Sequence, residues 1–470
     1  MRMNHQLSLV WIDTLCEYPI YGEIANTPLY NSSHDVSLPL AAVYLSTFLS
    51  RHRPDITFKY HPRRLYEADG VPRPLAELVH DGDVVLTSCS TADSLDAQRI
   101  LSAAKEAGKI TVIGGIYPRF CHTTIVDWGT ADYICTGEGE MALLAIVDQI
   151  TGRSELRSIA GVATSHVPRP ASAKLIDLSA LPDPDYEGFP LKSFATYMNS
   201  AYILATRGCP APCHFCTSAR LYGYSYRMRP VASVVREVND LYERGFRKIT
   251  LADDTVLVDH SWATELFTEL SNHNPGVRLK IRARADELTA EMIRIMVDAG
   301  VEVVQFGVES IQLSTRLSMH KRLEQESIQR AFDLVLSTDS LCANPLYMLA
   351  YPGETWEDLD ANCAYIKERG ADRRVITYIS FTTPYPGTGF SRTIRRSGGG
   401  VVLTKDLKYY TNKFPVFIPA SLLTMSVDQA LNDLVARFND VAECVNQSFP
   451  TQRRVPQEFF DEIKIHHVDA

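Results

Sequence analysis

The chain has 470 residues, of which 45% are hydrophobic and 22% charged, and its formal net charge is -9. That length exceeds one ordinary domain and allows two or three, each with its own core. The acidic balance argues against nucleic acid or an anionic membrane surface as the main partner and leaves room for a cationic small molecule. No apolar run approaches the eighteen residues of a membrane span, and the N-terminal segment lacks a signal-peptide cleavage site, so we expect a cytoplasmic protein.

The first third of the chain alternates apolar strand signals with amphipathic helix signals. This rhythm predicts a parallel, doubly wound sheet, which binds ligands beyond the carboxyl ends of its strands. Glycine-rich or polar loops fall at those ends, at 88–91, 114–118 and 137–140. They would let a ligand approach the backbone, although tight strand-to-helix turns explain them equally well. We expect strands over 7–12, 56–60, 83–88, 110–113 and 133–135, and helices over 38–49 and 93–107.

Residues 153–198 are richer in proline and serine than the flanking sequence. Prolines at this density discourage a long helix. We therefore expect an extended linker that packs along both neighbouring domains.

Three cysteines, Cys209, Cys213 and Cys216, lie within eight residues directly after the apolar run 202–205. The run predicts a buried strand, which places the thiols on the loop at its carboxyl end. Three thiolates at this spacing can hold three irons of a [4Fe–4S] cluster and leave the fourth iron open. A redox dithiol or a zinc site is the alternative, but the chain offers no partner pair for zinc. The other seven cysteines are scattered, and we expect free thiols of a reducing compartment.

After the cysteine loop, the alternation of strands and helices resumes. Polar residues gather at the same ends of the strands, where barrel enzymes place their chemistry. With the strand before the cysteines, six units predict a partial parallel barrel that is open on one side. The remaining strands are expected over 248–254, 279–286, 303–310, 342–350 and 375–381, and a helix with an apolar stripe over about 426–445.

The Cys-x-x-x-Cys-x-x-Cys spacing, with the aromatic Phe215 before the last cysteine, resembles the signature of the radical S-adenosylmethionine (SAM) superfamily. The resemblance implies an open iron that chelates SAM and supplies the electron that splits it into methionine and a 5'-deoxyadenosyl radical. It also implies roles at the strand ends. Ala252, Asp253 and Asp254 lie where the family binds the SAM amino group, and Arg284 suits the SAM carboxylate. Glu309 and Ser310 fall in an element near the ribose, and the turns at 351–355 and 384–388 resemble two further family elements.

The N-terminal sheet resembles the cobalamin-binding domain that precedes the barrel in one large subclass of this superfamily. The chain lacks the Asp-x-His-x-x-Gly pattern by which a histidine ligates cobalt in some of these domains, so the binding of cobalamin stays open. We divide the chain into a cobalamin-binding-like domain (1–152), a linker (153–198), a radical SAM partial barrel (199–392) and a small, mainly helical C-terminal region that closes the barrel (393–470).

Overall resemblance favours the radical SAM diol dehydratases of apramycin-type aminoglycoside biosynthesis, which act on paromamine. It implies a lyase that abstracts hydrogen from a cationic aminosugar and drives radical dehydration, with an electron donor or partner reductase. The alternative is a cobalamin-dependent radical SAM methyltransferase of natural-product biosynthesis, and a third hypothesis is a non-enzymatic sensor. An acid or base is needed near the substrate hydroxyls. The candidates are Asp254, Glu309, Tyr222, Tyr224 and Tyr226.

Overall fold

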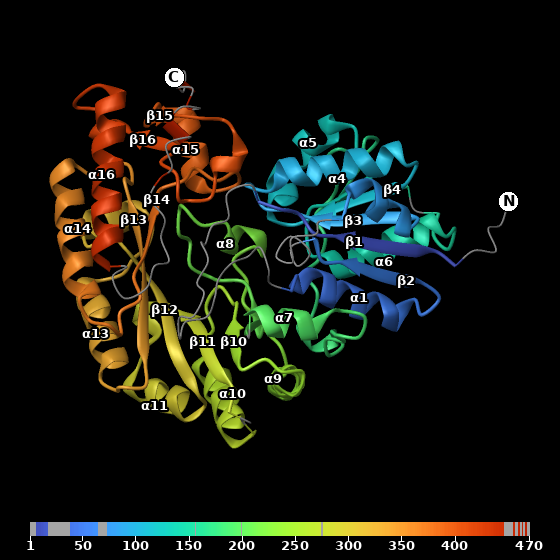
Figure 1. Cartoon of the computed structure of the whole chain (residues 1–470), viewed down its shortest axis with the longest axis horizontal. Helices are drawn as coiled ribbons and strands as arrows, with labels where there is room; N and C mark the ends of the chain where they lie inside the picture. The colour runs from blue at the N-terminus through green and yellow to red at the C-terminus, as the bar shows by residue number, and fades with distance from the viewer. Residues whose placement is uncertain are drawn as a thin grey trace. The chain divides into compact units, whose positions relative to one another are not determined.

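The computed structural model describes residues 6–16, 38–63, 73–155, 157–198, 200–273 and 276–445, together with residues 455, 459–460, 463 and 466–467. The described residues form two compact units, one ending at Met198 and the other beginning at Ser200. Each unit is built around its own six-stranded sheet with helices packed on it (Figure 1).

The sheet of the first unit has the strand order β2-β1-β3-β4-β5-β6, in which the first five strands are parallel and β6 is antiparallel to β5. Its central strands are mostly apolar and largely buried because helices cover both faces. The predicted doubly wound sheet is confirmed. The strands are β1 (Ser8–Ile12), β2 (Thr57–His61), β3 (Val84–Ser88), β4 (Ile110–Gly114), β5 (Tyr133–Cys135) and β6 (Val162–Ala163), and the longer helices are α1 (Leu40–His52), α4 (Ser94–Glu106), α5 (Ile116–Trp128) and α6 (Gly139–Ile150).

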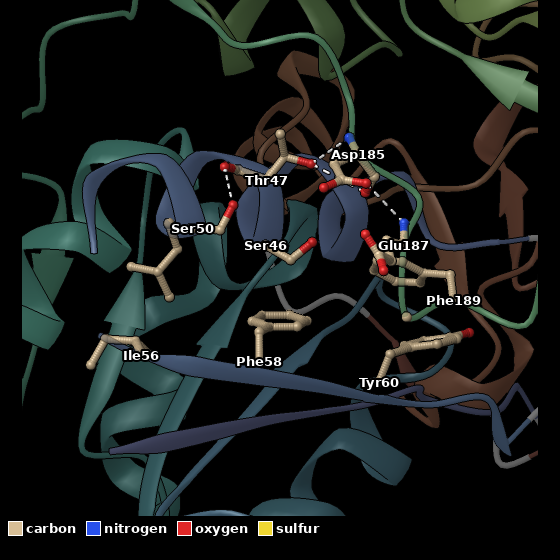
Figure 2. Close-up of a pocket in the computed structure, with 11 residues that line it drawn as sticks. Ser46, Thr47, Ser50, Ile56, Phe58, Tyr60, Asp185, Glu187 and Phe189 are labelled. Atoms are coloured by element: carbon tan, nitrogen blue, oxygen red, sulfur yellow. Dashed lines mark hydrogen bonds between the residues drawn. The ribbon is translucent and has the colours of Figure 1, made fainter. Parts of the chain in front are cut away.

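The segment expected to be a linker is part of this first unit. It supplies β6, a 3-10 turn (Leu178–Ala180) and α7 (Leu191–Met198). Figure 2 shows how its residues 185–189 pack on α1 and β2: the backbone N–H of Asp185 donates to Thr47 Oγ1 at 2.8 Å, and the Phe189 and Tyr60 rings lie 5.0 Å apart. A cavity of about 160 Å³ lies between these elements. The proline-rich segment is therefore packed against α1 and β2 of the first unit.

The second unit contains a curved, fully parallel sheet in the order β14-β13-β12-β11-β10-β7. Helices lie along its outer side (Figure 1), so the six predicted units of a partial barrel are confirmed. The strands are β7 (Ser200–Ile203), β10 (Lys248–Leu251), β11 (Arg278–Ala283), β12 (Val301–Glu309), β13 (Cys342–Leu349) and β14 (Tyr378–Phe381), and the helices between them are α9 (Val231–Glu243), α10 (His260–His273), α11 (Ala290–Asp298), α12 (Leu313–Ser318), α13 (Gln325–Leu336) and α14 (Trp356–Gly370).

The C-terminal region combines one long helix with a small antiparallel sheet. Helix α16 (Val427–Val445) buries the predicted apolar stripe, and its Phe438 stacks on Phe381 of β14 with ring centroids 4.3 Å apart. The sheet pairs β15 (Gly400–Val402) with β16 (Phe417–Pro419) and with β17 (His466–His467). Among the described residues, no helix is both long and apolar enough to cross a membrane.

Candidate active site

The cysteine loop leaves the carboxyl end of the first barrel strand. Two short antiparallel strands, β8 (Thr206–Arg207) and β9 (Arg227–Met228), form its base. Gly208 begins the loop at φ +100°, and a Cβ there would lie 2.2 Å from the carbonyl oxygen of Ser225, so only glycine fits this turn. The loop is thus closed at its base and presents its three cysteines between the two strands.

His214, between the second and third cysteines, ties the loop to the rest of the barrel. Its backbone N–H donates to the Met319 carbonyl at 2.8 Å, and its carbonyl accepts from Phe390 N–H at 2.9 Å. Its ring nitrogens lie 3.1 Å from Tyr351 Oη and 3.2 Å from Thr393 Oγ1. No sequence pattern indicated this anchoring role. The predicted Phe215 packs at the edge of an apolar cluster that includes Met319, Tyr351 and Phe390.

Burial raises the pKa of all three thiols, that of Cys216 to about 11. The Ser218 N–H, 3.4 Å from Cys216 Sγ, and the cations Lys321 and Arg284 near Cys213 oppose this effect. No group of three His, Cys, Asp or Glu side chains in the described part of the chain is arranged around a single metal ion. A [4Fe–4S] cluster gives each thiolate its own iron, so three half-buried thiols on one loop suit its chemistry.

The two carboxylates after β10 have different environments. Asp253 is fully buried and accepts hydrogen bonds from the backbone N–H groups of Ala205 and Thr206 and, at 2.5 Å, from Thr206 Oγ1. Burial raises its pKa to about 6 despite these bonds. Asp253 therefore holds the strand that leads into the cysteine loop. Asp254 is exposed, accepts from Ser218 Oγ at 2.6 Å and follows Ala252, so it is the carboxylate that faces the loop.

Arg284 lies directly after β11, close enough to Cys213 and Cys209 for its charge to lower their pKa values. Its Nε and Nη2 donate to Asp286 at 3.0 and 2.7 Å. This pairing fixes the guanidinium beside the cysteine loop, where a carboxylate ligand would meet a cation.

Glu309 ends β12 in a left-handed backbone conformation, with φ +65°. Its Oε1 accepts a hydrogen bond from Lys321 Nζ at 2.7 Å, and both side chains are less than a tenth exposed. A Cβ at Gly307 would lie 2.1 Å from that oxygen and 2.3 Å from Nζ, so the glycine makes room for the pair. The carboxylate proposed as an acid or base is thus held in a buried ion pair. Lys321, which no sequence pattern marked, is its partner.

Ser310 belongs to a buried network and not to an exposed rim. Its hydroxyl donates to Glu354 Oε1 at 2.9 Å and accepts from Asn362 Nδ2 at 3.1 Å. Glu354 Oε2 accepts from the Tyr351 N–H at 2.9 Å, and burial raises the pKa of Glu354 to about 7. The network joins the end of β12 to the turn after β13, so the two elements that resemble family motifs are held together through Glu354.

The three tyrosines after the cysteines have different environments. Tyr226 Oη donates to the Val256 carbonyl at 3.2 Å, and the Tyr222 ring lies under the Arg227 guanidinium, 5.4 Å from its centroid. Tyr224 is 47% exposed and has φ +62°. Tyr224 is therefore the most exposed of the three, whereas Tyr222 and Tyr226 are half-buried.

In the first unit, the reversal of strand order between β1 and β3 marks the edge where doubly wound sheets bind ligands. Thr14, which follows β1, donates to the Ser88 carbonyl at 3.1 Å and to Asp93 at 2.5 Å. The glycine loops next to this edge pack against protein: a Cβ at Gly115 would lie 2.5 Å from the Cys89 carbonyl oxygen, and one at Gly139 would lie 3.0 Å from Leu45. These contacts with protein atoms explain why Gly115 and Gly139 have no side chain. The hydroxyls of Thr14 and Ser90, in the loops after β1 and β3, both donate to Asp93 and so tie these two loops together.

Comparison with known proteins identifies a domain within the second unit. Residues 203–378 match the model of the Radical SAM superfamily, which covers the cysteine loop and the barrel strands up to β14. Domains of this superfamily use a [4Fe–4S] cluster and SAM, and the donor set of the cysteine loop fits the cluster.

The relatives extend the match beyond the barrel. An uncharacterized methyltransferase of Pyrococcus horikoshii is 25% identical over 72% of this chain and 74% of its own length. The bacteriochlorophyllide d C-12(1)-methyltransferase of Chlorobaculum tepidum is 26% identical over 78% of this chain and 75% of its own length. Among solved structures, the radical SAM methyltransferase TsrM of Kitasatospora setae shares the fold, with a TM-score of 0.71 and 15% identity over 93% of this chain and 89% of that one. A second structure of TsrM contains cobalamin and a [4Fe–4S] cluster.

Proposed function

We propose that the chain is a cobalamin-dependent radical SAM methyltransferase. The observation that carries the proposal is the combination, in one chain, of a doubly wound sheet and a radical SAM barrel. The methyltransferase relatives match 72% and 78% of the chain, more than the barrel alone. The fold of TsrM, a methyltransferase that binds both cobalamin and the cluster, covers nearly all of it.

Within this proposal, Cys209, Cys213 and Cys216 hold the cluster. Asp254 and Arg284, which flank the loop with opposite charges, suit the ammonium and the carboxylate of SAM. The three cysteines would hold a cluster that supplies the electron for reductive cleavage of SAM, and bound cobalamin would supply the carrier of the methyl group. The sheet edge at the loops after β1 and β3, where the strand order reverses, would hold the cobalamin. The chain offers no Asp-x-His-x-x-Gly element, so the sheet edge would bind it without that histidine.

The expected aminoglycoside diol dehydratase gains no support. The relatives described above are methyltransferases and favour the alternative reading. The acidic net charge, which suggested a cationic aminosugar, belongs to the whole chain and does not describe the interior of the barrel. The lyase and aminosugar readings are therefore set aside.

The decisive experiment is an anaerobic assay of the reconstituted enzyme with SAM and dithionite, with and without added cobalamin. We expect stoichiometric cobalamin in the purified complex and formation of S-adenosylhomocysteine that depends on it. The Cys213→Ala variant is the matched control, since it should keep cobalamin and lose cluster iron. A protein that excludes cobalamin, yet forms 5'-deoxyadenosine from SAM, would contradict the methyltransferase proposal while preserving the radical SAM assignment.

A further inference from the structure

Strand β11 carries basic residues at every second position. The odd-numbered residues Leu279 and Ile281 are fully buried, whereas the even-numbered positions from Arg278 to Arg284 are all lysine or arginine. Because successive side chains of a strand point to opposite faces, the basic residues share one face. Figure 1 shows α10 and α11 on the outer side of the sheet, so the basic face is the inner, concave side of the barrel.

The ends of this basic row have carboxylate partners and its middle does not. Arg278 lies 3.6 Å from Glu302, and Arg284 pairs with Asp286 at 2.7 Å. Among the described residues, no carboxylate lies within 4 Å of Lys280 or Arg282, although both are only partly exposed. A charge withdrawn from water without a partner costs free energy, so an anionic ligand on this face would stabilise the charged forms of Lys280 and Arg282.

The neighbours of the two cations are neutral hydrogen-bonding groups. Arg282 Nε donates to Gln305 Oε1 at 2.8 Å, and Gln305 Nε2 donates to Asn344 Oδ1 at 2.6 Å, across the register of β11, β12 and β13. These amides orient the guanidinium, and the Asp254 carboxylate, more than 4 Å away, also feels its charge. Burial, and after it the charge of Arg282, lowers the pKa of Lys280 to about 7.

We propose that Lys280 and Arg282 bind an anionic group of the substrate, a carboxylate or a phosphate, on the inner face of the barrel. The inference rests on the proposed function only in naming the bound molecule as the substrate of a methyl transfer. Arg284, beside the cysteine loop, lies two residues beyond Arg282 and four beyond Lys280. These offsets correspond to about 7 and 13 Å along the strand. The anion would thus lie deeper in the barrel than SAM.

The test uses the full-length, cluster-reconstituted enzyme and two probes, inorganic phosphate and propionate, each titrated at constant ionic strength against chloride. The unfolding midpoint is followed, because a ligand that binds only the folded state raises it. We expect one probe to raise the midpoint with saturation, which identifies phosphate or carboxylate as the preferred anion. Arg282→Gln and Lys280→Met should each lower the affinity for that probe at least ten-fold, whereas Lys280→Arg should retain the wild-type affinity.

Arg278→Gln is the matched control, since this residue lies on the same strand and face but already has a carboxylate partner. Equal probe affinity in wild type and in both charge-removing variants would overturn the proposal. Loss of probe binding at saturating SAM would also overturn it, because the anion site would then be that of the SAM carboxylate. Cobalamin content and S-adenosylhomocysteine, measured on the same samples, report the proposed function separately from anion binding.

Discussion

Lys321 Nζ lies 2.7 Å from Glu309 Oε1, and the pair is enclosed beside the cysteine loop, where both charges act on the Cys213 thiol. The charge of Lys321 lowers the pKa of Cys213, and the charge of Glu309 raises it. The pair also fixes the strained end of β12, since Glu309 has a positive φ. The carboxylate expected to exchange protons with substrate is therefore engaged in an ion pair whose charges act on Cys213.

Removal of one partner should be costly. Glu309→Gln leaves the Lys321 ammonium buried without a counter-ion, and we expect a loss of about 3–5 kcal/mol in the free energy of unfolding. Chemical denaturation measures this loss. The double variant Glu309→Gln with Lys321→Met should lose less than Glu309→Gln alone, because no unpaired charge remains. Equal stability of Glu309→Gln and wild type would show that the pair does not form.

Replacement of one cysteine should abolish the cluster. We expect Cys213→Ala to lose bound iron and all reductive cleavage of SAM, because two thiolates no longer hold three irons of the cluster. Iron analysis and 5'-deoxyadenosine formation measure the two effects. Cys444→Ser, at an exposed thiol far along the chain on α16, is the control and should retain both. Retained SAM cleavage in Cys213→Ala would refute the site.

The two adjacent aspartates should respond differently to amidation. Asp253→Asn places an amide against the donors of Ala205 and Thr206 and should destabilise the fold by about 1–3 kcal/mol. Asp254→Asn removes an exposed carboxylate, so it should leave the unfolding midpoint nearly unchanged and raise the KM for SAM. Measurement of both quantities in both variants separates the roles. A raised KM for Asp253→Asn without loss of stability would indicate that Asp253 contacts SAM.

Cluster assembly should be faster at alkaline pH. Burial raises the pKa of the thiols, that of Cys216 to about 11, and iron binds the thiolate. The fraction of thiolate, and with it the rate of reconstitution, should rise from pH 7 to pH 9. The absorbance of the growing cluster follows this rate. A rate independent of pH in this interval would mean that deprotonation of the thiols does not limit assembly.

The same shift has a consequence for the protein without its cluster. Because the folded pKa of Cys216 exceeds that of an unfolded thiol, its contribution to stability is present below about pH 8.5 and is lost as the pH rises toward 11. The unfolding midpoint of the cluster-free protein should therefore fall over that interval. In Cys216→Ser, the unfolding midpoint should decrease less with rising pH. An equal decrease in this variant and in the wild type would contradict the raised pKa of Cys216.

The amino-acid sequence by itself determined the repeating architecture and the cluster loop. Apolar strands that alternate with amphipathic helices have few ways to bury both faces of a sheet, so the parallel strands of both sheets could be predicted from periodicity, whereas the antiparallel β6 could not. Three closely spaced cysteines predict a cluster site from the sequence alone, because the spacing of the thiolates is local and does not depend on distant contacts.

Tertiary structure alone decided which polar residues remain available for ligands. Asp253 and Asp254 are equivalent in a sequence pattern, but only packing buries the first against Thr206 and leaves the second exposed. Lys321 and Glu354 meet their partners Glu309 and Ser310 across 12 and 44 residues, and local periodicity does not encode such pairs. The net charge of the chain likewise averages over the whole surface, whereas the strand register of β11 gathers four cations on the inner side of the barrel.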